Sequence, residues 1–222
     1  PAKDYSVIII LPCSAHKPYS DSQSHASFRK IIRQEMKTSR KLIHEIIITS
    51  PIGLVPRELE NIFPIAHYDI PVTGNWDEFE IKTTGSQLSN WLQKYNKLKN
   101  NNLKVIAHIS GGYKQACKFA EKQIQKNYPN FSFEYTMPDL VEYSPSSRKG
   151  LQCLQKKLHH LNSSLKKPER TKKELIQEPT RDEIQIRATL DYQFGPGVGD
   201  YIIQNGAILS KSHHPQFQEI YV

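Results

Sequence analysis

The stretch SVIIILPCSAHKPYSDSQSH, residues 6–25, joins a strongly apolar run to a loop that is dense in reactive side chains. The run Ser6–Leu11 is rich in β-branched residues, which is typical of a strand in a parallel sheet with both faces covered. The next fourteen residues, Pro12–His25, carry a thiol, an amine, two imidazoles, a phenol, a carboxylate and four hydroxyls. A simple connection between two elements does not need this chemistry. The stretch therefore predicts a buried strand that opens directly into a functional site.

The rest of the chain continues the alternation of strand and helix. Three further apolar runs indicate strands, at Glu45–Thr49, Lys104–Ser110 and Phe131–Met137. Four amphipathic stretches indicate helices, at Ser24–Lys37, Glu78–Leu98, Gly112–Lys126 and Ser146–Leu161. Strands that alternate with helices are typical of α/β domains. We therefore expect a doubly wound three-layer α/β sandwich around a four-stranded parallel sheet.

The loops after the four strands are the expected place for a ligand, because open α/β sheets bind ligands beyond the carboxyl ends of their strands. The first strand is followed by Pro12–His25, and the second by residues 50–60 and 66–80. The third strand is followed by the pair Gly111-Gly112, and the fourth by residues 138–147. All of these loops are expected to meet at one edge of the sheet, which we call the rim.

Cys13, at the carboxyl end of the first strand, is the candidate nucleophile. The cations beside it in the sequence are expected to lower the pKa of its thiol; the alternative is a small buried residue of the core. His67 and Asp69, two positions apart in a loop, are candidates for general acid or base catalysis, unless they only tie that loop down. His25 either caps the helix that follows it or serves as an acid.

A second group of rim residues is predicted to bind the substrate. Lys17 lies between prolines in a stiff loop, where its charge either anchors a phosphate or carboxylate or is simply solvated. Trp76 either stacks on a base or fills the core. The pair Gly111-Gly112 allows a tight entry into a helix, with or without an anion at its amides. The candidate binding residues are Lys17, Tyr19, Ser22, Arg57, Trp76, Gly111, Gly112 and Ser144.

Composition narrows the class of protein. Lysine and arginine total 30 against 22 for aspartate and glutamate, a net charge of +8 that favours a polyanionic partner such as nucleic acid. The three cysteines, Cys13, Cys117 and Cys153, are too few for a disulfide framework and lack zinc-type spacing with histidine, so we expect no metal and no cofactor. Without a signal peptide or an apolar run as long as a membrane span, the chain is expected to be a soluble, cytoplasmic protein.

A change of composition near residue 162 indicates a domain boundary. Residues 1–162 are expected to form the α/β domain, and residues 163–180, rich in alternating charges, a linker. Residues 181–222 combine a helix-like stretch, a glycine-rich turn and two strand-like runs, which indicates a small α+β module. The chain opens at Pro1 without a methionine, and we expect it to be a piece of something longer.

The spacing Pro12-Cys13, three residues, Lys17-Pro18-Tyr19, two residues, Ser22, two residues, His25 resembles the signature of archaeosine synthase, the archaeal paralogue of tRNA-guanine transglycosylase. TSPIGLVPRELE (residues 49–60) and AHYDIPVTGNWDEFE (residues 66–80) are similar to neighbouring stretches of that family. DYQFGPGVGDYII (residues 191–203) is similar to the module that precedes its RNA-binding PUA domain. The α/β domain also resembles uracil-DNA glycosylases in outline. The family's transglycosylase-like barrel and a full PUA domain are absent from this sequence.

The resemblance implies tRNA modification. The family acts on tRNA that carries 7-cyano-7-deazaguanine in its D-arm and adds a nitrogen nucleophile, free lysine or another amino donor, to the nitrile to give an amidine. A radical-SAM partner enzyme then cleaves the lysine adduct. A companion subunit, or the missing domains, is a further expected partner. The alternatives are a tRNA- or base-binding module without catalysis, a partial subunit of a split enzyme, and a nucleobase glycosylase.

The implied chemistry gives the rim residues roles in a mechanism. We expect the Cys13 thiolate to add to the nitrile and form a thioimidate, from which an amine then displaces the sulfur. Asp69, His67 or His25 would carry the protons. The competing scheme is direct attack by lysine, with Cys13 as a bystander.

Overall fold

The computed structural model of the chain describes residues 5–50, 52–63, 65–66, 74–95, 102–139 and 143–165. All of them belong to one unit, Asp4–Lys167. The predicted module at 181–222 and most of the predicted linker lie outside the described residues, so the predicted division of the chain stays a prediction. No helix in the described ranges is both long and apolar enough to cross a lipid bilayer.

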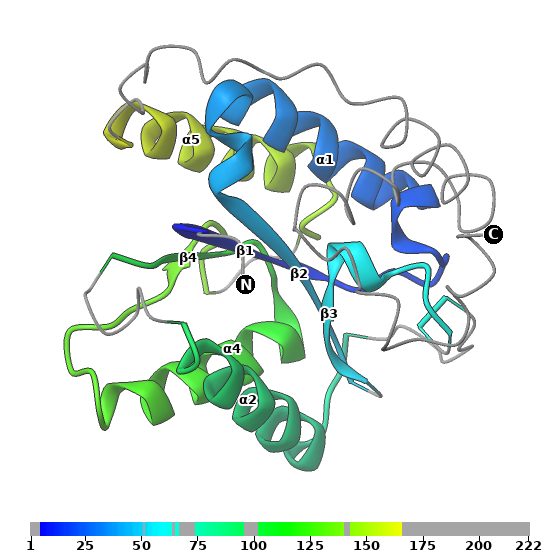
Figure 1. Ribbon diagram of the computed structural model, residues 1–222. Helices are drawn as coiled ribbons and strands as arrows, with labels where there is room; N and C mark the ends of the chain where they lie inside the picture. Colours follow the sequence, from blue (N-terminus) through cyan, green and yellow to red (C-terminus); the bar gives the residue numbers. More distant parts are fainter. Residues whose placement is uncertain are drawn as a thin grey trace, which may run out of the picture. The chain divides into compact units, whose positions relative to one another are not determined.

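A five-stranded mixed sheet forms the middle of the fold (Figure 1). Its strands are β1 (Val7–Pro12), β2 (Ile43–Thr49), β3 (Gly53–Pro56), β4 (Lys104–Ala107) and β5 (Glu134–Tyr135), in the order β3-β2-β1-β4-β5. The central strand β1 runs parallel to β2 and β4, and β5 runs parallel to β4. The four strands predicted from the sequence are β1, β2, β4 and β5, and the last two are shorter than predicted.

Strand β3 corrects the prediction of an all-parallel sheet, because it pairs antiparallel with β2. Only three residues separate β2 from β3, and such a short connection permits a hairpin but not the crossover of a dozen or more residues that a parallel strand needs. Gly53 has a φ of +90°, which a residue with a side chain rarely adopts. Pro56 ends the strand at the sheet edge, where its missing N–H is tolerated.

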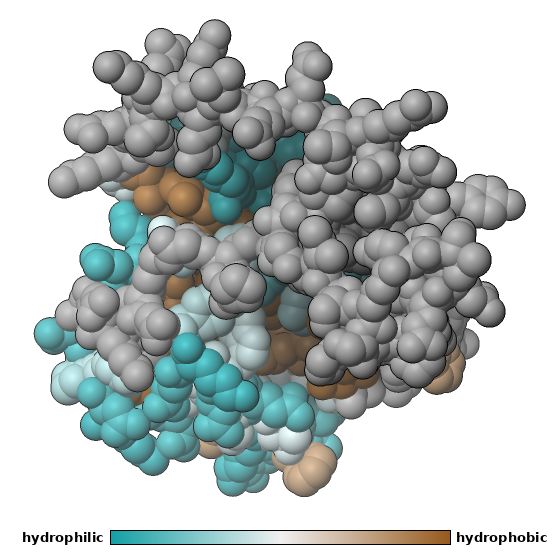
Figure 2. Space-filling view, in the orientation of Figure 1, coloured by the Kyte–Doolittle hydropathy of each residue, from teal (hydrophilic) through white to brown (hydrophobic). Residues whose placement is uncertain are grey.

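Helices cover both faces of the sheet (Figure 1). Helices α1 and α5 pack together on one face, and α2 and α4 pack together on the other. The outward sides of α2 and α4 are mostly hydrophilic, as the lower part of Figure 2 shows. The helix bounds are α1 Gln23–Met36, α2 Glu78–Leu92, α4 Gly111–Gln125 and α5 Arg148–Ser164, with short 3-10 turns η1 Tyr19–Asp21, η2 Lys37–Leu42 and η3 Arg57–Leu59. The predicted doubly wound α/β architecture is thus confirmed apart from the antiparallel strand.

The core explains why the first strand contains so few polar residues. Ile8 and Ile10 belong to the apolar cluster under α2 and α4, whereas Val7, Ile9 and Leu11 belong to the cluster under α1 and α5. All five side chains are fully buried. Successive side chains of a strand point to opposite faces, so a strand covered on both sides must be apolar at every position.

Candidate functional site

Cys13 lies at the rim, directly after the last residue of β1, and is half-buried. Its Sγ atom lies 2.9 Å from the hydroxyl of Tyr113, in the first turn of α4. Thr49, the last residue of β2, also hydrogen-bonds the thiol. The thiol is therefore contacted by the last residue of β2 and by a residue that follows β4, the two strands beside β1, as expected for the carboxyl edge of a parallel sheet.

The pKa of the Cys13 thiol is raised above its ordinary value, and burial is the main cause. Hydrogen bonds from Tyr113 and Thr49 and the charge of Lys17 act in the opposite direction, because they stabilise the thiolate. The prediction of a lowered pKa was wrong: Lys17 has the expected effect, but it is outweighed by desolvation. At neutral pH the sulfur is protonated and already faces the groups that favour its ionised form.

The pair Gly111-Gly112 lets two aromatic rings, those of Trp76 and Tyr113, pack together near the thiol. We call these two rings the aromatic wall. A Cβ atom on Gly112 would lie 2.5 Å from the Cβ of Trp76, and the backbone N–H of Gly112 donates to the carbonyl of Gly74 at 3.0 Å. Gly111 has a φ of +56°. The close approach packs the half-buried Trp76 against Tyr113, with 4.6 Å between the ring centroids. Five rim residues thus form one site: Cys13, Trp76, Gly111, Gly112 and Tyr113.

His25 is fully buried behind the loop that carries Cys13. Its Nε2 lies 2.9 Å from the carbonyl oxygen of Pro12, and its Nδ1 lies 2.8 Å from Nη2 of Arg57. Because a carbonyl only accepts and a guanidinium only donates, Nε2–H donates to Pro12 and Nδ1 accepts from Arg57. Burial, followed by the charge of Arg57, lowers the pKa of His25 to about 3. This geometry favours a positioning role, and proton transfer by His25 stays a prediction.

Arg57 is the centre of a buried polar network, with a side chain that is only 12% exposed. Its Nε donates to Glu45 at 3.0 Å and its Nη1 to Glu60 at 2.9 Å. Glu60 in turn accepts from the backbone N–H of Ser20 at 2.9 Å. The network ties the loop after β1 to β2 and η3. Because these internal carboxylates already engage the guanidinium, the predicted contact of Arg57 with a substrate anion stays a prediction.

Three further predicted site residues, Lys17, Tyr19 and Ser22, belong to the loop that carries Cys13. Tyr19 is fully buried against Ile47 and Val55, so it anchors the loop that carries Cys13 to the core. Ser22 caps α1 by accepting from the backbone N–H of His25. Lys17 is half-buried and close enough to act on the thiol.

Two loops complete the predicted set. Ser144 is exposed before α5, where its carbonyl accepts a 2.7 Å hydrogen bond from the Ser147 hydroxyl. His67 and Asp69 lie outside the described residues. Within the described ranges, no three His, Cys, Asp or Glu side chains gather as metal ligands would.

His108 was not predicted, yet its surroundings resemble those of His25. It is fully buried, its Nε2 lies 3.0 Å from the carbonyl oxygen of Pro145, and its Nδ1 lies 2.6 Å from the hydroxyl of Thr136. Both imidazoles pack against the ring of Phe28, with 5.4 Å between ring centroids for His25 and 5.2 Å for His108. Burial lowers the pKa of His108 to about 4. The available sequence signal is an imidazole directly after the strand Lys104–Ala107.

We expect the free energy of unfolding to fall as the pH drops from 7 to 5. The folded pKa values of His25 and His108 are about 3 and 4, well below the ordinary 6.5. Between the folded and the ordinary pKa values, the unfolded chain binds protons that the folded chain does not. The free energy of unfolding therefore falls as the pH falls, by about 2 kcal/mol per histidine at pH 5. Urea unfolding at each pH measures this loss. His108→Asn should flatten the dependence, whereas His159→Gln, at an exposed position, should not. A constant midpoint in the parent chain would contradict neutral, buried imidazoles.

Comparison with known proteins supplies the family. Residues 1–158 match the family described as "Domain of unknown function (DUF5591)". The chain belongs to this family. The DUF5591 match includes the whole of the Cys13 loop and every residue of the site described above.

Curated relatives of this DUF5591 chain confirm the predicted resemblance to archaeosine synthases. Archaeosine synthase subunit alpha of Methanosarcina acetivorans is 34% identical over 216 residues, 97% of this chain and 31% of that protein. The subunit alpha of Thermococcus kodakarensis is 32% identical, over 94% of this chain and 33% of that protein. Archaeosine synthase of Methanocaldococcus jannaschii is 36% identical, over 86% and 28%. The chain therefore spans about a third of the length of these relatives.

One solved structure, the crystal structure of AF0587, a protein of unknown function, matches with a TM-score of 0.47 and 24% identity. The match covers 86% of this chain and 53% of that one.

Proposed function

We propose that this chain carries the nitrile-converting site of an archaeosine synthase, which acts on 7-cyano-7-deazaguanine in tRNA and joins it to lysine. The observation that carries the proposal is the Cys13 thiol, held at the rim within 2.9 Å of the Tyr113 hydroxyl. The names of the archaeal relatives support the choice of substrate.

The proposed reaction has two steps and needs no oxidant or reductant. In the first, the Cys13 sulfur bonds to the nitrile carbon, and the thiol proton ends on the nitrile nitrogen, which gives a thioimidate. In the second, the lysine amine bonds to the same carbon, the carbon–sulfur bond breaks, and the amine proton restores the thiol. The product is an amidine, with all atoms of lysine and nitrile retained.

Tyr113 is the proposed proton relay of the first step. Because burial raises the pKa of the thiol, the sulfur must lose its proton as it attacks, and the adjacent hydroxyl is placed to accept it. The same hydroxyl can pass its own proton to the nitrile nitrogen, so no net charge has to be buried. His67 and Asp69 are proposed to handle the proton of the incoming amine.

Binding of the base is assigned to the aromatic wall. The exposed part of Trp76 offers a surface on which the deazaguanine ring stacks once it has left the tRNA core. Lys17 is the proposed anchor for a phosphate or for the carboxylate of lysine. We further infer that His25, held by Arg57, positions the Pro12 carbonyl directly before Cys13. Proton transfer by His25 and anion binding by Arg57 are the alternative roles.

The proposed enzyme needs more than this chain. Two relatives are named subunit alpha, and this chain spans about a third of each. We therefore infer that further domains or a companion subunit complete the archaeosine synthase. A radical-SAM enzyme is the proposed consumer of the lysine adduct.

The test is to incubate the chain with tRNA that carries 7-cyano-7-deazaguanine and with radiolabelled lysine. Label that becomes attached to the tRNA supports the proposed transferase. Release of free base would indicate a glycosylase instead, and tRNA that binds but stays unchanged would indicate a non-catalytic reader. Intact-mass measurement after mixing the chain with the free nitrile base, without lysine, tests the first step alone, because the thioimidate adds the full mass of the base to Cys13.

A further inference from the structure

The two helical layers of the domain differ strongly in charge. Elements α1, η2 and α5 carry ten lysines and arginines against one acidic residue, Glu35, a net charge of +9. The opposite layer, α2 and α4, carries four basic and three acidic residues, a net charge of +1. One face of the sheet thus holds more positive charge than the net +8 of the entire chain.

Most of this charge faces solvent. Among the described ion pairs, Arg40 binds Glu45 and Lys157 binds Glu134, which accounts for two of the ten cations. The exposed cations form what we call the basic face, and they are Lys30, Arg33, Lys37, Lys41, Arg148, Lys149 and Lys156. No ion pair within the described part of the chain neutralises Lys30, Arg33 or Lys156.

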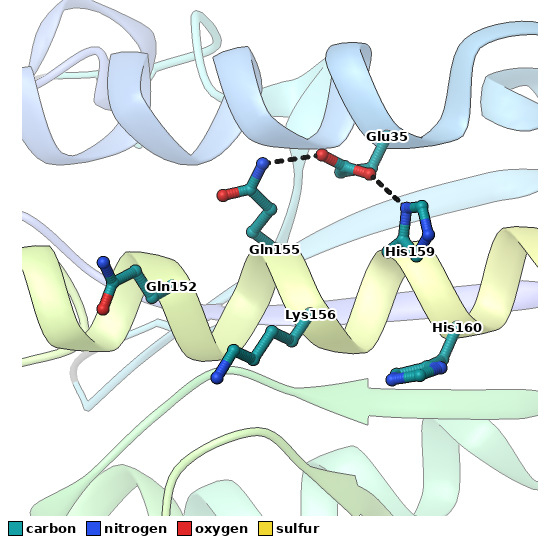
Figure 3. Close-up of a pocket in the computed structure, with 6 residues that line it drawn as sticks. All are labelled: Glu35, Gln152, Gln155, Lys156, His159 and His160. Atoms are coloured by element: carbon teal, nitrogen blue, oxygen red, sulfur yellow. Dashed lines mark hydrogen bonds and ion pairs between the residues drawn. The ribbon is translucent and has the colours of Figure 1, made fainter.

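A shallow hollow of about 450 Å³ lies within the basic face (Figure 3). It is lined by Glu35 from α1 and by Gln152, Gln155, Lys156, His159 and His160 from α5. Glu35 accepts from Gln155 Nε2 at 2.8 Å and from His159 Nδ1 at 3.2 Å, and its side chain is only 15% exposed. The single acidic group is therefore occupied internally, and the hollow presents amide, imidazole and ammonium donors to solvent.

The donors have a regular spacing that suits a polyanion. Arg148, Gln152, Lys156 and His160 follow one another at every fourth position of α5, so they form a stripe along one side of the helix. At 1.5 Å per residue the stripe is about 18 Å long. Lysine and arginine bind the phosphates of nucleic acids, while glutamine and other neutral donors contact phosphate and sugar oxygens.

We propose that the basic face binds the phosphate backbone of helical RNA. The RNA is a stem of the tRNA substrate, so this inference rests on the proposed function. Helical RNA is recognised mainly through phosphates, 2′-hydroxyls and shape, which matches a wide basic surface without a deep pocket. Helix α1 begins at Gln23, directly after the loop that carries Cys13, and α5 begins after the rim loop that ends at Ser147. A stem on this face therefore lies next to the rim, where its target base is needed.

RNA fits this face better than an acidic protein does. Protein interfaces depend on buried apolar and aromatic anchors. The exposed large hydrophobic side chains of the described residues are Leu59, Ile62, Phe63 and Phe79, and none of them belongs to α1, η2 or α5.

The test compares two variants with the same change of charge. The first, Lys30→Glu with Arg33→Glu and Lys156→Glu, reverses three charges on the basic face. The control, Lys82→Glu with Lys122→Glu and Lys126→Glu, reverses three exposed charges on the other layer. Fluorescence anisotropy measures the Kd of each chain for an unmodified tRNA transcript between 50 and 200 mM KCl, after thermal unfolding has shown that both fold.

We expect the basic-face variant to weaken binding by about tenfold or more and to reduce the slope of log K against log salt by about two to three, since each lost phosphate contact removes somewhat less than one. The control should stay within about twofold. Equal losses in both variants, an unchanged slope in the first, or no binding by the parent chain at 50 mM KCl would each overturn the proposal. Loss of association with an acidic companion protein while RNA binding persists would assign the face to that protein instead.

Failure of this inference is distinguishable from failure of the proposed function. Cys13→Ala should leave the Kd for tRNA unchanged, because Cys13 lies at the rim and not on the basic face. Normal tRNA binding through the basic face without lysine transfer would rule out the proposed chemistry and leave this inference standing. Lysine transfer by a basic-face variant whose Kd for tRNA is unchanged would rule out this inference and leave the proposed chemistry standing.

Discussion

Cys13→Ser is expected to reduce lysine transfer to nitrile-bearing tRNA by about a thousandfold or more, the scale of loss seen when an enzyme's nucleophile is removed. Serine keeps the size of cysteine and can still hydrogen-bond to Tyr113, so the fold should be preserved. Its hydroxyl is a far weaker nucleophile than a thiol at neutral pH. Rates of label transfer under single-turnover conditions measure the change.

The matched control for this change is Cys153→Ser, in α5, which should transfer lysine at the parent rate. Binding of tRNA should be the same for both variants and the parent chain. Unimpaired amidine formation by Cys13→Ser would eliminate the covalent scheme and leave direct attack by lysine. The intact-mass adduct should likewise form in Cys153→Ser and be absent in Cys13→Ser.

Arg57→Met is expected to lower the free energy of unfolding by about 3–5 kcal/mol, the usual cost of removing one partner from a buried charge network. The change leaves Glu45 and Glu60 buried with fewer donors and removes the hydrogen bond to His25. For a domain of this size the unfolding temperature should drop by about 10 °C. Thermal and urea unfolding, followed by circular dichroism, measure both quantities.

Arg33→Met is the control, because Arg33 is exposed on α1 and its loss should change stability by less than about 0.5 kcal/mol. Unchanged stability of Arg57→Met would mean that the network does not hold the loop. Weaker lysine binding by a stable Arg57→Met variant would then support the predicted contact of Arg57 with a substrate anion.

Much of the fold could be predicted because the signals are local. The alternation of apolar runs and amphipathic stretches is visible in short windows, and both faces of β1 had to be apolar once helices covered the sheet. Strand β3 was missed because Gly53–Pro56 contains a glycine and a proline in four residues, which is typical of a loop. Its pairing depends on β2, beside which it folds back.

The site was only partly predictable, because its essential contacts join distant residues. Cys13 was recognised from the chemistry of its own loop, whereas Tyr113 lies 100 positions away and reaches the thiol only through the packing of α4. The pKa of Cys13 shifts opposite to the predicted direction for the same reason: the charge of Lys17 is visible in the sequence, and burial is not. Likewise, the sequence shows that Arg57 is charged but not that two carboxylates surround it.

The contact between Gly112 and Trp76 restricts what evolution can place at position 112. A Cβ atom there would lie 2.5 Å from the Cβ and 2.7 Å from the Cγ of Trp76, and 3.0 Å from its backbone nitrogen. Every residue except glycine also carries a Cβ at position 76, so a smaller side chain in place of the tryptophan would not make the room. We therefore expect descendants of this chain to keep the glycine, since its loss would require the backbone that carries the proposed partner of the base to move.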